Sequence, residues 1–154
     1  MSAESCTALA DSIRRWGAEL GFQQIGIAGI AVEADEVRLM RWLALDRHGE
    51  MGYMQRHGSR RARPHEIVPG TVRVISARMD YLPPEARDAE TVLADPTLGY
   101  VSRYALGRDY HKLLRARLAK LAERIDDAIG PRGHRVFVDQ ATSRVGRVTA
   151  ARLT

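Results

Sequence analysis

The feature that most constrains the fold is a one-sided apolar stripe in residues 108–129. Leu114, Leu118, Leu121 and Ile125 recur there at spacings of four, three and four residues. Because an α-helix turns once in about 3.6 residues, side chains with this spacing share one face of a helix. A helix with a single apolar face has to cover that face with another element. The stripe therefore predicts a long surface helix packed on a core.

The other periodicities alternate between helix and strand. The predicted elements are a helix at 5–20, a strand at 23–28, a helix at 33–47, a strand at 71–81, the helix at 108–129 and a strand at 135–138. In the helix at 33–47 the apolar stripe is predicted to consist of Val37, Met40 or Arg41, and residues 43–45. Gly21 can cap the first helix, and Pro83 ends the second strand because proline lacks the donor that a sheet needs. Residues 83–98 are polar and contain prolines, which predicts a mobile connection. We expect an α/β (α+β) fold: a small mixed or antiparallel sheet with packed helices, in a single domain.

Composition places the chain among soluble globular proteins. Hydrophobic residues make up 45% of its 154 residues and charged residues 28%. It has no run of 18 apolar residues and no basic-then-apolar leader, so we expect a cytoplasmic protein without a membrane span. The net charge of +5 favours a polyanionic partner such as RNA, although many basic domains never bind nucleic acid.

Residues 99–114 are unusually rich in hydrogen-bonding and titratable groups. Three tyrosines alternate there with three cations, a carboxylate and an imidazole, where a loop turns into a helix. This composition predicts a surface that binds a large polar ligand. The alternative is that Tyr104 and Tyr110 only cover the edge of the core. His111 invites a metal-ligand interpretation, but no second His or Cys lies at ligand spacing, so we predict no metal site.

The cysteine count limits the redox chemistry of the chain. Cys6 is its only cysteine. A [4Fe–4S] cluster is held by four thiolates, so this chain alone cannot build one.

Several motifs in the same order and spacing resemble one known family. The segment RYALGRDYH at 103–111 looks like the signature of the epoxyqueuosine reductases, cobalamin-dependent iron–sulfur enzymes of tRNA modification. The other matching segments are LGFQQIGI at 20–27, HGEM at 48–51, RARP at 61–64, VPGTVRVIS at 68–76 and VFVD at 136–139. The resemblance covers about residues 8–139, nearly the whole chain.

The resemblance implies an activity and its cofactors. Members reduce epoxyqueuosine at the wobble position of tRNA to queuosine. Cobalamin delivers electrons to the epoxide, two [4Fe–4S] clusters in a ferredoxin-like second half feed them in, and an external donor supplies them. That second half has no counterpart here. Cations along the helix at 108–129 are then either a solvated face or part of a tRNA-docking surface.

The resemblance also implies site residues. Asp139 corresponds to the proton donor, and its place after a buried strand favours the protonated form that a general acid needs. The structural alternative is an aspartate that caps the next turn. Arg61 and Ser102 are the first candidates for cobalamin contacts, and Arg61 could instead belong to a solvated basic loop. The second candidates are Arg103, Tyr104 and Asp109.

The family pattern ends abruptly after Asp139. Residues 1–139 therefore predict the N-terminal cobalamin-binding domain, and residues 140–154 a divergent, disordered tail. A frameshift that truncates a reductase would explain the change, and a natural short protein is the alternative. We expect the chain alone to be inactive in the full reaction. The alternative functions are a stand-alone cobalamin-binding or tRNA-binding module and a fragment that folds poorly.

Overall fold

The computed structural model describes residues 3–81, 85–106, 108–131, 133–138, 148 and 149. The helices are α1 (Ala3–Glu19), α2 (Glu33–Ala44), α3 (Gly52–Arg56), α4 (Ala89–Ala94) and α5 (Tyr110–Ile129), with short 3-10 turns η1 (Gly58–Arg61), η2 (Pro64–Glu66) and η3 (Arg103–Ala105). The strands are β1 (Gln24–Ala28), β2 (Val74–Arg78), β3 (Arg135–Val136) and β4 (Val148–Thr149).

The strands form one small antiparallel sheet in the order β1-β2-β4-β3. In the β1–β2 pair, Ile25 lies opposite Ala77 and Ile27 opposite Ile75. The predicted α+β fold with a small antiparallel sheet and packed helices is therefore confirmed. Strand β4 comes from residues 140–154 and pairs with β2 and β3, while the proposed division of the chain at residue 139 stays a prediction.

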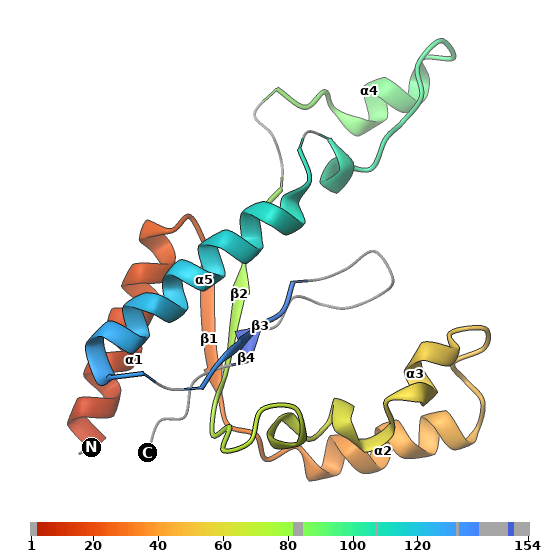
Figure 1. The fold of residues 1–154 in the computed structure, drawn as a ribbon. Coiled ribbons are helices and arrows are strands. Elements are labelled where there is room, and N and C mark those ends of the chain that lie inside the picture. Colours follow the sequence, from red (N-terminus) through yellow and green to blue (C-terminus); the bar gives the residue numbers. More distant parts are fainter. Residues whose placement is uncertain (1–2, 82–84, 107, 132, 139–147, 150–154) are drawn as a thin grey trace.

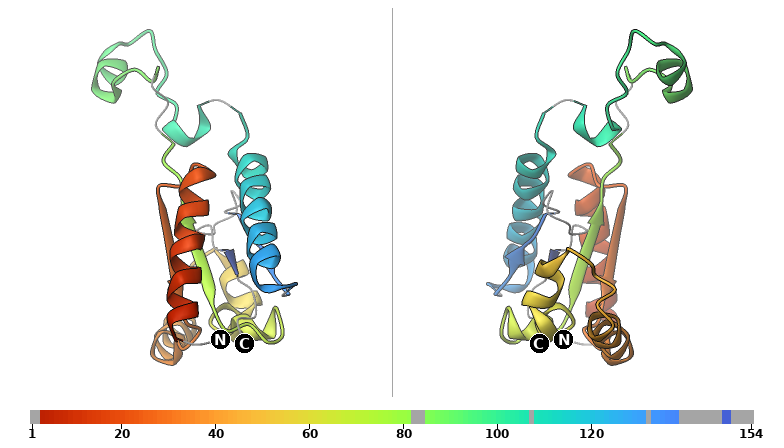
Figure 2. Two further views of the ribbon diagram at one scale, coloured as in Figure 1. Left: turned by 90° about the vertical axis from the view of Figure 1, so that its left-hand side faces the viewer. Right: turned by 90° about the vertical axis from the view of Figure 1, so that its right-hand side faces the viewer.

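Helices α1 and α5 cover one face of the sheet, and the opposite face is open (Figures 1 and 2). Ile25, Ile27 and Ala77 pack against the core on the covered face. Gln24 and Ser76 are exposed on the other face, as the alternation of side chains along a strand requires. Antiparallel sheets tolerate this one-sided burial.

The core lies between the two helices and the sheet. Its buried members are Leu9, Ile13, Phe22, Ile75, Leu118, Leu121, Ile125 and Val138. The apolar stripe of α5 is confirmed, with Leu114 partly buried beside the three buried members of the stripe. Gly21 has φ +83° and ends α1, because its N–H bonds to the Ala18 carbonyl at 2.9 Å and the Phe22 N–H to the Gly17 carbonyl at 3.0 Å.

Two details differ from the sequence prediction. Residues 83–98 were expected to be a mobile connection, and the helix α4 within them was not predicted. Asp88 caps this helix by accepting the Thr91 N–H at 3.1 Å. The cap was missed because the whole segment is polar and Asp88 does not stand out in it. In α2 the predicted apolar stripe is mostly wrong, since Val37 is 69% exposed and Leu43 is the buried residue of the helix.

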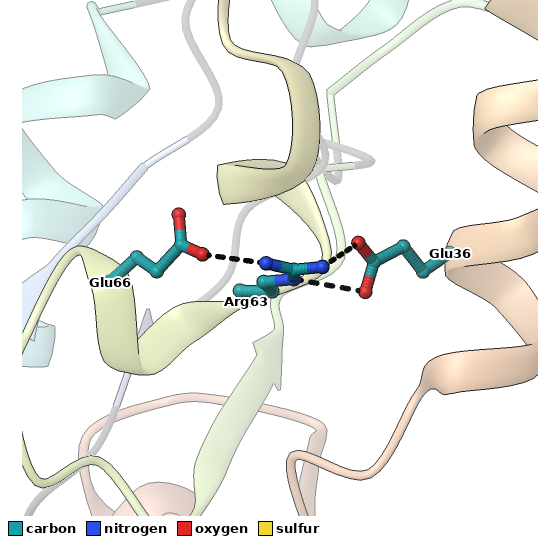
Figure 3. A network of polar contacts seen from close by, with 3 residues as sticks. All are labelled: Glu36, Arg63 and Glu66. Carbon is teal, nitrogen blue, oxygen red and sulfur yellow. Dashed lines mark hydrogen bonds and ion pairs between the residues drawn. The ribbon is translucent and has the colours of Figure 1, made fainter.

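Two parts of the chain project beyond opposite ends of strands β1 and β2 (Figure 1). One carries α2 and α3, and the other is an arm that carries α4. In the first part Arg63 joins α2 to η2 by an ion pair with Glu36 at 2.8 Å and another with Glu66 at 3.1 Å (Figure 3). Among the described residues, no helix is long and apolar enough to cross a membrane.

Candidate functional site

An open pocket lies where the end of β2 meets the start of α5. Its volume is about 230 Å³, and its lining residues are Asp80, Tyr81, Arg103, Tyr104, Leu106, Arg108 and Tyr110. Asp80 and Tyr81 lie just after β2, and the others come from η3, from the segment between η3 and α5, and from the first residue of α5. The chain thus brings together residues that lie more than twenty positions apart in the sequence.

The N-terminal end of α5 is fixed by Asp109. Its carboxylate accepts the backbone N–H of His111 at 3.0 Å and lies 2.7 Å from Nδ1 of the same residue. The hydrogen bond from the His111 side chain, followed by the one from its backbone, lowers the pKa of Asp109 below its usual value. Helix α5 therefore begins at Tyr110, two residues later than predicted, because a cap residue lies outside the helix.

The aromatic side chains of the site contact one another. The Tyr110 ring stacks on the His111 ring, with centroids 4.1 Å apart and planes at 25°. The Tyr104 ring meets Tyr110 edge-on, with centroids 6.2 Å apart and planes at 88°. Asp109 bonds to His111, and His111 stacks on Tyr110. These contacts fix the orientation of the aromatic rings in the ligand-free protein. Tyr104 itself is 54% exposed.

The cations of the pocket are available to a ligand. Arg103 and Arg108 are exposed, and neither forms an ion pair or a side-chain hydrogen bond with the residues that the structure describes. Ser102 precedes η3, and its hydroxyl makes no capping hydrogen bond. Unpaired guanidinium groups beside aromatic rings suit an anionic or strongly polar partner.

Arg61 lies in a different part of the fold from the other predicted cofactor residues. Its Nη2 donates to the Tyr53 carbonyl at 2.7 Å, its Nε donates to the Met54 carbonyl at 3.1 Å, and its guanidinium lies 5.6 Å from the centroid of the Tyr53 ring. These bonds fasten η1 to α3. The structure therefore groups Arg103 and Tyr104 in one pocket, with Ser102 and Asp109 next to pocket residues in the chain. It places Arg61 on the projection that carries α2 and α3, and Asp139 lies outside the described residues.

Sequence reasoning missed Asp80 and Tyr81 as pocket residues. Both residues were placed inside the predicted strand at 71–81, whereas β2 ends at Arg78 and leaves them beyond the sheet. Sequence reasoning also assigned nothing to His48, which is 6% exposed and lies 6.0 Å from Trp42 between ring centroids. Nδ1 of His48 has no hydrogen-bond partner among the residues that the structure describes.

The polar side chains of the site suit one of the two kinds of cofactor that the resemblance implies. The exposed hydroxyl and guanidinium groups at Ser102 and Arg103 fit the amide-rich rim of a large polar cofactor such as cobalamin. An iron–sulfur cluster does not fit, because the chain has one cysteine, and no group of three metal-ligating side chains occurs in the part that the structure describes.

Comparison with known proteins decides the family. Residues 61–140 match the family described as "Epoxyqueuosine reductase QueG, DUF1730". The chain belongs to this family.

Curated epoxyqueuosine reductases agree with that assignment. The protein of that name from Pseudomonas aeruginosa is 62% identical over 133 residues, and those from Salmonella typhimurium and Escherichia coli are 61% and 58% identical. Each match covers 86% of this chain and 37%, 34% and 35% of the respective relative, so the chain spans about a third of their length. No solved structure matches this epoxyqueuosine reductase family member.

Proposed function

We propose that the chain forms the cobalamin-binding and catalytic first part of an epoxyqueuosine reductase, a cytoplasmic oxidoreductase that reduces epoxyqueuosine in tRNA to queuosine. The observation that carries this proposal is the identity of 62% to a curated epoxyqueuosine reductase over 86% of the chain. The family match at residues 61–140 covers the pocket, α5 and the segment that leads to Asp139.

The polar residues of the pocket region would hold the cofactor. Ser102 offers an unpaired hydroxyl, and Arg103 and Tyr104 offer an exposed cation and ring beside it. Arg61 would approach from the projection that carries α2 and α3. Asp109 would act by keeping the start of α5 in place. When bound, cobalamin supplies the electrons of the reduction.

Asp139 would supply a proton. Removing an epoxide oxygen as water to leave an alkene takes up two electrons and two protons. A carboxylic acid that protonates the departing oxygen makes it a better leaving group.

Electrons for repeated turnover have to come from outside this chain. One cysteine cannot hold the [4Fe–4S] clusters that the family resemblance implies. We therefore expect cobalamin binding without turnover when the chain is given a physiological electron donor.

Titration of the purified chain with cob(II)alamin, followed by absorption and electron paramagnetic resonance, tests the binding. Saturable binding that Ser102→Ala or Arg61→Gln weakens is expected, and absence of binding would refute the proposal. Reduction of epoxyqueuosine-containing tRNA with a strong chemical reductant tests the chemistry. Asp139→Asn should abolish any such reduction while cobalamin still binds, and Asp127→Asn, an exposed aspartate near the end of α5, is the matched control.

A stand-alone module that binds cobalamin or tRNA without turnover is the second candidate. The observation that favours it is the single cysteine, because the chain alone cannot hold the clusters that turnover would need. Tight cobalamin or tRNA binding with no reduction under strong chemical reductant would select this candidate. Reduction that depends on Asp139 would exclude it.

A further inference from the structure

We propose that β1 is an interaction surface for a second copy of this chain, and that the two β1 strands pair antiparallel about a two-fold axis at Gly26. Strand β1 is an end strand of the sheet, and no strand pairs with its outer side in the part of the chain that the structure describes. An end strand presents unpaired N–H and C=O groups that can pair with another strand. The inference does not rest on the proposed function.

The outer edge of β1 lacks the usual protection of an end strand. Proteins shield such edges with charged side chains, with proline or by keeping the strand very short. Residues 20–32, which contain β1, include no charged residue and no proline. At the other end of the sheet, β3 is two residues long and carries Arg135. The two ends of the sheet therefore differ, and β1 is the one suited to pairing.

The apolar side chains of β1 are incompletely covered on the face that carries the core. Ile25 and Ile27 pack against the core but remain partly exposed. Ile75, which lies opposite Ile27 on the inner strand β2, is 2% exposed. An inner strand has neighbours on both sides, whereas β1 has one. A further strand beside β1 would cover the two isoleucines of β1 through cross-strand contacts.

The sequence of β1 is complementary to itself. When Gly26 of one copy lies opposite Gly26 of the other, Ile25 of each copy lies opposite Ile27 of the other, and Gln24 opposite Ala28. Because side chains alternate between the faces of a strand, this register keeps all the isoleucines on the face that carries the core. β-branched residues directly opposite each other stabilise an antiparallel pair. The strand therefore has a favourable register with its own copy.

Charge favours this contact, and its size limits the affinity. The chain has a net charge of +5, so two copies repel each other in most orientations. The uncharged segment at residues 20–32 lets them approach without bringing like charges together. Two strands of five residues bury less surface than the about 1,200–2,000 Å² of a stable interface, so we expect a weak dimer with a Kd of about 10 μM to 1 mM.

Sedimentation equilibrium of the full chain tests the inference with charged variants at the axis. Gly26→Lys and Gly26→Glu each place two like charges opposite one another, which should raise the dimer Kd about 2- to 5-fold. An equal mixture of the two variants places unlike charges there and should dimerise more tightly than either variant alone. Gly133→Lys and Gly133→Glu are the matched controls for net charge. A Cβ at Gly133 or Gly26 meets nothing within 4 Å, and the Gly133 variants and their mixture should show no such pattern.

Cross-linking tests the register. In a Cys6→Ser chain, which removes the one native thiol, Gly26→Cys places a thiol on each side of the axis. A short bis-maleimide should join two such copies faster than it joins two copies of Gly133→Cys, and equal rates would overturn the inference.

Two results of the sedimentation experiment would also overturn the inference. One is a chain that stays monomeric up to about 1 mM, which would favour a partner for β1 from the further length that the relatives carry. The other is a dimer with the same Kd for the Gly26 variants, their mixture and the Gly133 controls, because such a dimer uses another surface. Circular dichroism of each variant shows that the fold is retained.

Discussion

Gly17→Ala tests how closely α1 approaches the sheet. Gly17 is in the interior of α1, where glycine costs about 0.5–1 kcal/mol relative to alanine because of its greater backbone freedom. From helix propensity alone the substitution should stabilise the protein. However, a Cβ built on Gly17 would lie 2.4 Å from Cγ1 and 2.7 Å from Cδ1 of Ile25 on β1, well inside contact distance.

The steric term should exceed the gain in helix propensity. Ile25 is β-branched and stiff at χ1, and it packs against the core, so it cannot simply rotate away. Overpacking of this kind costs about 1–3 kcal/mol. Subtracting the helix gain leaves a net loss of up to about 2.5 kcal/mol. In a chain of 154 residues, a loss of about 1 kcal/mol lowers Tm by about 2–4 °C.

Urea and thermal unfolding of a small mutant set measure the effect. Gly52→Ala is the matched control, because Gly52 begins α3 and a Cβ there meets nothing within 4 Å. In an Ile25→Ala background, which lacks both clashing atoms, Gly17→Ala should become neutral or stabilising. A Gly17→Ala protein with a higher Tm than the wild type would refute the reasoning.

Three further predictions follow from the core, the helix cap and the ion pairs. Leu121→Ala should lower the free energy of unfolding in urea by about 2–5 kcal/mol, because this side chain is 1% exposed; a loss under about 1 kcal/mol would contradict the packing of α5 on the core. The pKa of Asp109 is lowered, chiefly by the His111 side chain, so its stabilising contribution is complete above the unfolded value near about 3.9 and is lost as the pH falls through the lower folded value. In thermal melts, Tm should therefore fall less between about pH 6 and 2 for Asp109→Asn than for the wild type. An equal fall in Tm for both proteins would rule out this cap. Arg63→Met should speed protease cleavage within residues 57–67, while Arg38→Met, whose partner Asp35 is on the same helix, should leave the rate unchanged.

The sequence predicted the elements that build the core. Helical spacing located α1 and α5, and the strand patterns located β1 and β2 with ends a few residues too long. These predictions succeeded because burial of one face leaves a periodic mark on the chain. Helix α4 was missed because it has no buried residue, and its start depends on a single cap at Asp88. Val37 was wrongly placed in an apolar stripe for a related reason, since α2 projects from the sheet and leaves this side exposed.

The candidate site was likewise predicted only in part from the sequence. Residues 99–114 were identified as a ligand surface from their composition, since a packed core has little use for so many polar and charged groups. The sequence could not show that Asp80 and Tyr81 join them, because that meeting depends on where β2 ends relative to the start of α5. Nor could it show that Arg61 gives two donors to the carbonyls of Tyr53 and Met54.

The sequence by itself determined the family, the single thiol and the helices and strands of the core, because motif identity, composition and hydrophobic period are properties of the chain. Only the tertiary structure decided which polar groups share a pocket and which are already bonded. Those outcomes depend on distances between segments far apart in sequence. Such distances are set by the packing of α1 and α5 on one face of the sheet, which leaves the other face open.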